Sequence, residues 1–235
     1  MFCIRMADMT IQIDHRYEYV RALCRDYVIP DVEKIDLAVA VTEEEIQAEL
    51  SISQFSTHPS YAEAVCIYRK ICKQLPNRFD AFLFHCALIE YEGRGYAFAA
   101  KSGTGKSTHI ALWQKHFGEN VRVVNGDKPI FRFVSNSLLA YGTPWCGKEG
   151  LQINTSVPLR AICFLERAQT NTIRKIKADE AVMRIFHQIL TPEDVPSLDA
   201  LVPLLDRTLR EIPCYVLGCT ISEEAAEVAY RGMND

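Results

Sequence analysis

The chain has 235 residues, 49% of them apolar, which is enough to bury a sizeable core. Its 26 Lys and Arg against 30 Asp and Glu give a net charge of −4, and the basic residues are spread along the chain, which argues against a nucleic-acid partner. No apolar run approaches the length of a membrane span, and the N-terminal hydrophobic residues are interrupted too early for a signal peptide. We therefore expect a cytoplasmic globular protein with no membrane partner.

The nine cysteines also bear on the cellular compartment. They are odd in number, are scattered from Cys3 to Cys219, and include no C-x-x-C pair. This pattern favours reduced, mostly buried thiols over a disulfide scaffold. Cys146 is the expected exception because it lies in a polar, glycine-rich loop.

The first third of the sequence predicts a small α+β region over residues 1–79. Its predicted elements, in chain order, are a hairpin at 2–13 turning at Ala7-Asp8, a helix at 17–29, a strand at 36–42, a helix at 43–50 with a Thr42/Glu45 capping box, a loop at 51–60 and a helix at 61–75. The last helix is expected to turn Ala64, Ile67, Tyr68, Ile71 and Leu75 inward. No chemical motif appears here, so by elimination this region is where an acceptor or partner would be recognised.

From residue 80 onward the pattern changes. Residues 81–91 and 96–101 are β-rich and are separated by a turn with two glycines, while residues 107–117 have helical periodicity. Strand, glycine-rich loop and helix in this order provide the context of a phosphate-binding loop.

The residues from Ala100 to Ser107 match the P-loop pattern, with alanine in place of its first glycine. Glycines in the loop let backbone N–H groups turn toward one anion, and the helix that follows adds its positive N-terminal dipole. Lys106 would reach the β- and γ-phosphates of ATP, and the Ser107 hydroxyl would bind Mg²⁺. The residues expected to bind the nucleotide are Ser102, Gly103, Thr104, Gly105, Lys106, Ser107 and Thr108. The alternative is a Gly-Ser turn that happens to precede a helix.

Asp127 follows a predicted strand at residues 121–126, at the sheet edge where the P-loop would also emerge. A carboxylate there can bind Mg²⁺ or accept a proton from an attacking hydroxyl. The alternative is an aspartate that caps a turn in Asn-Gly-Asp-Lys-Pro.

The loop at residues 141–150 follows a predicted hairpin at 130–141 and carries Trp145, Lys148 and Glu149. Lys148 could neutralise charge on a transferring phosphate. The alternative is a solvated surface loop with Trp145 packed onto the core. His85 lies in the first β-rich run, where a catalytic role competes with that of a satisfied core histidine.

The sequence from residue 158 onward contains no candidate site residue and predicts only structural elements. It predicts strands at 158–167, 171–177 and 213–220 and helices at 178–190, 196–212 and 222–233. Strands and helices mixed around one sheet indicate an α/β fold, with mixed α+β as the alternative.

Four stretches, HCALIEYEGRGYAFAAKSGTGKST, VVNGDKPIFR, YGTPWCGKEG and AICFLER, resemble the HPr serine kinase/phosphorylase group of the phosphoenolpyruvate-carboxykinase-like P-loop superfamily, over about residues 81–177. The resemblance implies a kinase core with a central mixed sheet over residues 80–235, Glu149 assisting the metal, His85 near the phosphates and a homo-oligomer. That group uses a pair of aspartates where this chain has Gly126 and Asp127, so one carboxylate would serve both roles or the activity would be reduced.

These observations predict an ATP- and Mg²⁺-dependent phosphotransferase that acts on a serine-type hydroxyl of a protein, a peptide or a small molecule. Asp127 would be the base and Lys106 would stabilise the moving phosphoryl group. An ATP-binding regulatory module without turnover is the alternative, and Gly126 favours it. A carboxykinase is a weaker third hypothesis, because the chain is short for that family's separate substrate domain.

Overall fold

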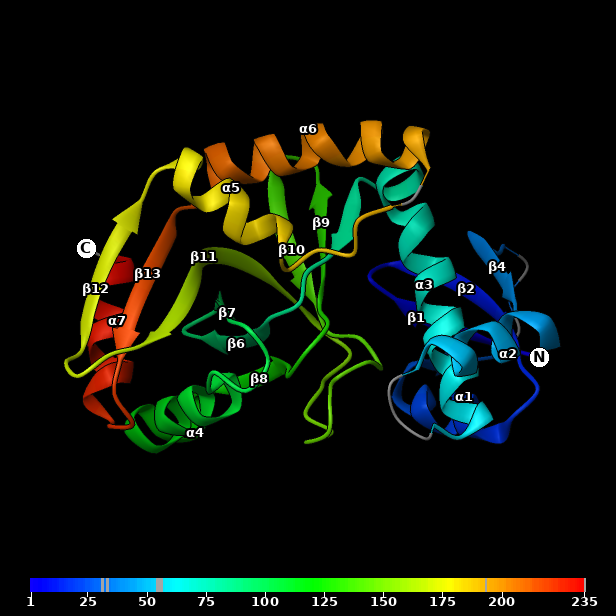
Figure 1. The fold of residues 1–235 in the computed structure, drawn as a ribbon, viewed down its shortest axis with the longest axis horizontal. Coiled ribbons are helices and arrows are strands. Elements are labelled where there is room, and N and C mark those ends of the chain that lie inside the picture. The colour runs from blue at the N-terminus through cyan, green and yellow to red at the C-terminus, as the bar shows by residue number, and fades with distance from the viewer. Residues whose placement is uncertain (31, 33, 54–56, 193, 235) are drawn as a thin grey trace.

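A four-stranded sheet in the order β3-β1-β2-β4 forms the N-terminal part of the molecule, at the right of Figure 1. The computed structural model describes residues 1–30, 32, 34–53, 57–192 and 194–234. The elements of this part are β1 (Phe2–Met6), β2 (Met9–Asp14), α1 (Glu18–Leu23), β3 (Val28–Ile29), β4 (Leu37–Ala40), α2 (Glu43–Ile52) and α3 (Pro59–Phe79). The predicted hairpin is confirmed, and Ala7 and Asp8 form its turn with φ of 50° and 56°.

The helices of this part differ from the prediction in their ends. The helix predicted at 17–29 is interrupted and too long: α1 ends at Leu23, a short 3-10 helix follows at Arg25–Tyr27, and Ile29 then pairs with Cys3 at the edge of β1. The Thr42 capping box is confirmed. The predicted loop at 51–60 is shorter, since α2 runs to Ile52 and α3 begins at Pro59, and its residues 54–56 lie outside the described part. On α3 the expected inward residues are buried except Tyr68, which is half-buried.

A nine-stranded mixed sheet fills the rest of the molecule and curls about its longest strand, β11. One half of β11 pairs with β10, its other half pairs with β13, and its opposite edge pairs with β7. The strands are β5 (Ala81–Leu83), β6 (Ala87–Tyr91), β7 (Arg94–Ala99), β8 (Arg122–Asn125), β9 (Ile130–Val134), β10 (Ser137–Tyr141), β11 (Ser156–Arg167), β12 (Thr172–Ile176) and β13 (Cys214–Cys219). The hairpin predicted at 130–141 and the strands predicted near 158–177 and 213–220 are confirmed.

Helices cover both faces of this sheet, as Figure 1 shows. They are α4 (Lys106–Phe117), α5 (Ala178–Phe186), α6 (Val195–Glu211) and α7 (Glu224–Asn234). Alternate residues of β7 belong to the two cores: Ala97 and Ala99 pack on the side of α5 and α6, and Tyr96 and Phe98 on the side of α4 and α7. The chain therefore has a mixed α/β fold.

The strand directions bring three chain segments to one edge of the sheet. Both β7 and β8 are antiparallel to β6. The ends of β7 and β8 therefore meet beside the start of β6, which confirms that Asp127 emerges at the same edge as the loop after β7. The predicted turn at 92–95 joins two adjacent strands, β6 and β7, but the run at 81–91 is not one strand, because its first part, β5, pairs with β9. The break between them contains His85, whose N–H donates to Gln188 O at 2.6 Å.

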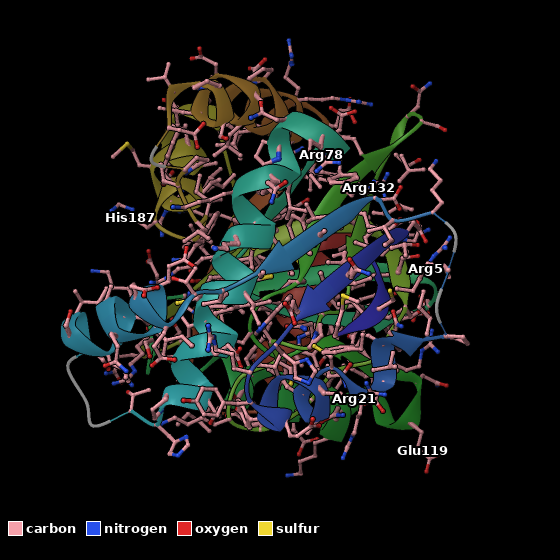
Figure 2. All side chains as sticks on the ribbon, turned by 90° about the vertical axis from the view of Figure 1, so that its right-hand side faces the viewer. Arg5, Arg21, Arg78, Glu119, Arg132 and His187 are labelled. Atoms are coloured by element: carbon pink, nitrogen blue, oxygen red, sulfur yellow. The ribbon has the colours of Figure 1, made fainter. Side chains whose placement is uncertain are left out.

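The N-terminal part docks on the nine-stranded sheet through polar and apolar contacts. Arg132, labelled in Figure 2 on the side of the N-terminal strands, donates to Ala7 O at 2.6 Å, and the Tyr141 hydroxyl donates to Asp8 Oδ2 at 2.5 Å. One hydrophobic cluster contains residues of β1, β2 and α3 together with Ile130 and Trp145. The predicted boundary between two domains at residue 79 stays a prediction. The shared cluster contains residues from both sides of that boundary.

The structure also tests the expectations of reduced thiols and of no membrane-spanning segment. All nine thiols are free, and seven of them are buried. Cys146 differs from the expectation: it is only 7% exposed, and burial raises the pKa of its thiol. Among the described residues, no helix is long and apolar enough to cross a bilayer.

Candidate functional site

The loop between β7 and α4 adopts a conformation that depends on two glycines. Gly103 and Gly105 have φ of 76° and 126°, values that side chains disfavour. The N–H of Thr104 donates to Lys101 O at 3.1 Å, which makes a turn within the loop. The first N–H groups of α4, from Lys106 to Thr108, lack intrahelical partners because of helix geometry. The loop and helix start therefore form a suitable cradle for an anion.

Arg167 braces the outer side of this loop from the end of β11. Its guanidinium donates to Gly103 O at 2.7 Å and to Thr104 O at 3.4 Å. Beside it lies a cavity of about 590 Å³ that runs between the loop, the end of β11 and the end of α5. Sequence reasoning missed Arg167, which was assigned only to a scaffold strand.

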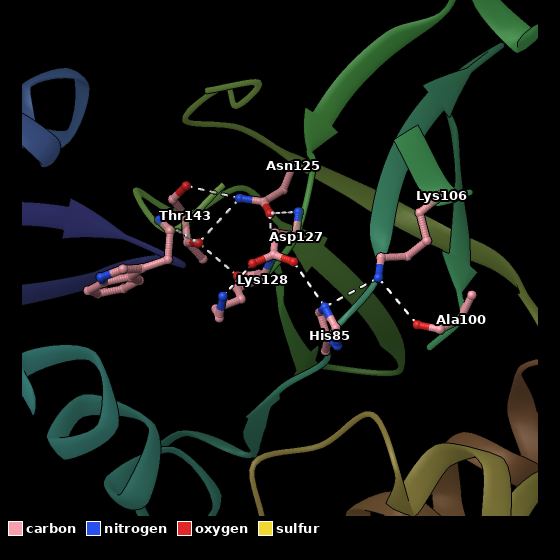
Figure 3. A network of polar contacts seen from close by, with 8 residues as sticks. His85, Ala100, Lys106, Asn125, Asp127, Lys128 and Thr143 are labelled. Carbon is pink, nitrogen blue, oxygen red and sulfur yellow. Dashed lines mark hydrogen bonds and ion pairs between the residues drawn. The ribbon is translucent and has the colours of Figure 1, made fainter. Parts of the chain in front are cut away.

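His85 lies between Lys106 and Asp127, as Figure 3 shows. Its Nε2 is 2.9 Å from Asp127 Oδ1 and 3.3 Å from Lys106 Nζ. Lys106 Nζ also donates to Ala100 O at 3.3 Å, and the other carboxylate oxygen of Asp127 is paired with Lys128. The imidazole thus comes from the break between β5 and β6 and joins the residue after β8 to the lysine at the start of α4.

The charges of this network depend on burial and pairing. Burial opposes the charge on Asp127, but hydrogen bonds from His85 and Lys128 outweigh it and lower the pKa of the carboxyl to about 2. Burial lowers the pKa of Lys106, an effect that the nearby Asp127 charge partly offsets. Burial also opposes the charge on Lys128, yet its bond to Asp127 raises its pKa. Asp127 is therefore an ionised carboxylate at neutral pH.

Asn125, the last residue of β8, fixes the position of Asp127. Its Oδ1 accepts from the N–H groups of Asp127 and Lys128 at 2.9 and 2.7 Å, and its Nδ2 donates to Thr143 O at 2.9 Å. Thr143 Oγ1 in turn donates to Lys128 O at 2.7 Å. Sequence reasoning missed Asn125, Lys128 and Thr143. The Asn-Gly-Asp turn could have indicated Asn125, because asparagine side chains bond to backbone N–H groups two residues on.

The loop at residues 142–150 lies over this network. Trp145 is 8% exposed and packs against Tyr68, as the alternative with Trp145 packed onto the core predicts. Glu149 Oε1 accepts from Ser107 Oγ at 2.8 Å. Lys148 lines the same cleft and makes no hydrogen bond or ion pair with the described residues. The structure thus brings together Ser107 and Glu149, two of the three predicted metal ligands; the third is Asp127.

Gly126 is glycine because the loop passes too close for a side chain. A Cβ at this position would lie 2.8 Å from Cys146 O, closer than real Cβ contacts. Gly147 makes a similar approach, since a Cβ there would lie 3.1 Å from Asp127 Cβ. An acidic side chain at position 126 would require the loop to move.

A cleft of about 920 Å³ contains most of the predicted site residues. It is lined by His85, Ser102, Gly103, Gly105, Lys106, Ser107, Thr108, Asp127, Lys148 and Glu149. Its other wall comes from α1 and α3 of the N-terminal part. No group of three or more His, Cys, Asp or Glu side chains with the arrangement of a metal site occurs in the described part of the chain.

A model of the family described as "ScmC: SynChlorMet cassette protein ScmC" matches residues 61–190, more than half of the chain. The chain belongs to this family. The residues that match the ScmC family include most of α3, the loop before α4 and the loop at 142–150. All the predicted site residues lie inside the match.

The chain is also similar to solved structures. No curated protein matches the chain significantly. The solved structure of the Hpr(Ser) kinase/phosphatase from Coxiella burnetii is similar with a TM-score of 0.40 and 9% sequence identity, over 65% of this chain and 88% of that chain. A similarity at that TM-score supports no conclusion about the function of this chain.

Proposed function

We propose that the chain is an ATP- and Mg²⁺-dependent phosphotransferase that moves the γ-phosphoryl group to a serine-type hydroxyl. The observation that carries the proposal is the placement of His85 Nε2 within 2.9 Å of Asp127 and 3.3 Å of Lys106. It joins an ionised carboxylate to the lysine of an anion cradle inside one cleft. A turn without function would not require these half-buried charged groups to be paired in this way.

The residues of the cradle suit a triphosphate. Lys106 and the N–H groups at the start of α4 would hold the β- and γ-phosphates, and the cavity beside Arg167 has room for the nucleoside. Ser107 Oγ and Glu149 offer two oxygen ligands, the kind that Mg²⁺ takes from proteins in addition to phosphate oxygens. Bound there, Mg²⁺ would neutralise charge on the phosphates.

Asp127 would orient the acceptor hydroxyl for the transfer. The hydroxyl oxygen attacks the γ-phosphorus, the bond from that phosphorus to the β–γ bridging oxygen breaks, and ADP leaves. The hydroxyl proton passes to Asp127 and from there to water. The pKa of about 2 makes Asp127 a weak base. This suits a loose transition state, in which the acceptor oxygen is still little deprotonated.

The test follows labelled γ-phosphate from ATP into hydroxyl acceptors. We expect Asp127→Asn to lower the transfer rate roughly 10²- to 10⁴-fold while the Kd for ATP, measured by calorimetry, changes little. Asp206→Asn on the exposed face of α6 is the matched control and should transfer at the wild-type rate.

Two outcomes would contradict the proposal. Equal transfer by the Asp127→Asn variant would remove Asp127 as the base. Binding of ATP without transfer to any acceptor would instead favour a regulatory module, the alternative that Gly126 suggests.

A further inference from the structure

The wall of the cleft opposite the anion cradle is aromatic and comes from the N-terminal part and the loop at 142–150. Tyr19 of α1, Tyr61 and Tyr68 of α3, and Trp145 line it, and we call these four residues the aromatic wall. Tyr61, Ala64, Val65 and Tyr68 all line the cleft and recur at helical spacing, so one face of α3 is turned to it.

The aromatic wall leads directly to Asp127. Lys128 Nζ, which is paired with Asp127, lies 5.9 Å from the centre of the Tyr68 ring, and that ring is 5.7 Å from the indole of Trp145. A group whose hydroxyl reaches Asp127 from this side of the cleft would therefore have these rings close by. The opposite, outer side of the cradle offers the second cavity for the nucleoside.

The outer half of the wall is exposed although it is apolar. Tyr19 is 42% and Tyr61 is 53% exposed, and their hydroxyls make no hydrogen bond with the described residues. Their position is fixed from behind, because the buried Glu63 carboxylate accepts from the N–H groups of Arg16 and Tyr17 at the start of α1. Exposed aromatic rings held in a cleft indicate a binding surface.

We propose that the aromatic wall selects the acceptor, and that the acceptor is a peptide whose serine has an aromatic neighbour. This inference rests on the proposed function and names its substrate class. A free amino acid bound at Asp127 would leave Tyr19 and Tyr61 at the mouth of the cleft uncovered. An extended peptide reaches them, stacks its aromatic side chain on the rings and offers backbone groups to the tyrosine hydroxyls.

The experiment compares two peptides that differ only in the residues flanking one serine, Phe-Ser-Phe against Ala-Ser-Ala. Their Kd values are measured by calorimetry on the full chain with a non-hydrolysable ATP analogue and Mg²⁺, and their phosphorylation is measured separately with ATP. We expect the aromatic peptide to bind roughly tenfold more tightly or better, the effect of burying apolar rings. Tyr61→Ala should bring the two Kd values close together without changing the Kd for the analogue, and Phe186→Ala, an exposed aromatic residue of α5, should preserve the preference.

Three results decide between the proposals. Equal Kd values for the two peptides in the wild-type protein, or no binding of either, would overturn the inference. A weaker Kd for the ATP analogue in Tyr61→Ala with an unchanged peptide preference would also overturn it, by making the wall a nucleobase site. Preferential binding of the aromatic peptide without phosphorylation would support the wall as a peptide site while contradicting the proposed transfer.

Discussion

His85 and Lys128 stabilise the charge on Asp127, so the free energy of unfolding should depend on the ionisation of this carboxyl. Its pKa is lowered from 3.8 to about 2, so the folded chain binds this proton less readily than the unfolded chain does. The stabilisation is complete above the ordinary pKa and is lost as the pH falls toward 2. A shift of this size corresponds to on the order of 2 kcal/mol.

We therefore expect wild type and Asp127→Asn to differ in how unfolding depends on pH. Between about pH 4 and pH 2 the free energy of unfolding of the wild type should fall by about 2 kcal/mol more than that of the variant. Urea titrations followed by circular dichroism at several pH values measure this difference. If the free energy of unfolding depended on pH in the same way in both proteins, the pKa of Asp127 would not be lowered in the folded state.

At the scale of single residues, the sequence indicated the site through residue types with special chemistry. Lys106, Ser107 and Asp127 were found because the P-loop pattern and a carboxylate after a strand have specific physical meanings. Lys128 and Thr143 could not be found in this way. Thr143 contacts Asn125 and Lys128 only because the loop at 142–150 folds onto the turn after β8, a contact between distant parts of the chain. Lys128 is next to Asp127 in sequence, but a lysine after an aspartate is no pattern that indicates a site.

Among the elements, the cradle depends on a neighbouring strand. Arg167 at the end of β11 donates to two carbonyl groups of the loop before α4, at Gly103 and Thr104. These bonds restrain the conformation of the loop from its outer side. Losing them would let the loop adopt other conformations, and binding would then have to order it.

We expect Arg167→Ala to weaken the binding of ATP several-fold, with little change in the urea midpoint because Arg167 is exposed. Arg174→Ala is the matched control, since Arg174 on β12 pairs with Glu180 away from the loop. Calorimetric titration of both variants with ATP and Mg²⁺ checks this. An unchanged Kd for Arg167→Ala would show that the loop is pre-formed without its brace.

The elements show where sequence periodicity succeeds and where it fails. The hairpins, α4 and the scaffold helices follow local patterns and were predicted within a few residues. The run at residues 81–91 is apolar except for His85 and Glu90, so its pattern gave no sign that the chain changes strand partners at His85. The pairing of β3 with β1 likewise outweighed the helical pattern of residues 24–29.

At the scale of the whole molecule, the N-terminal part and the nine-stranded sheet share one hydrophobic cluster. Trp145 belongs to this cluster, whereas Trp113 belongs to the cluster under α4 and α7. The two tryptophans therefore report on different parts of the protein. Because each part contributes residues to the shared cluster, neither can lose its structure without exposing apolar surface of the other.

We expect the chain to unfold in a single transition. In Trp113→Phe, the fluorescence of Trp145 should change at the same urea concentration as the far-ultraviolet circular dichroism of that variant, and the same should hold for Trp113 in Trp145→Phe. A change in Trp145 fluorescence at a lower urea concentration than the change in circular dichroism would show that the N-terminal part detaches first. That result is expected of two independent domains.

The close approach of Cys146 to Gly126 ties two segments of the chain to each other. A chimaera that took only the turn after β8 from a protein with an acid at this place would push the new side chain against the Cys146 carbonyl. The turn and the loop at 142–150 would have to be exchanged together. A substitution in one segment is tolerated only if the other segment leaves room for it.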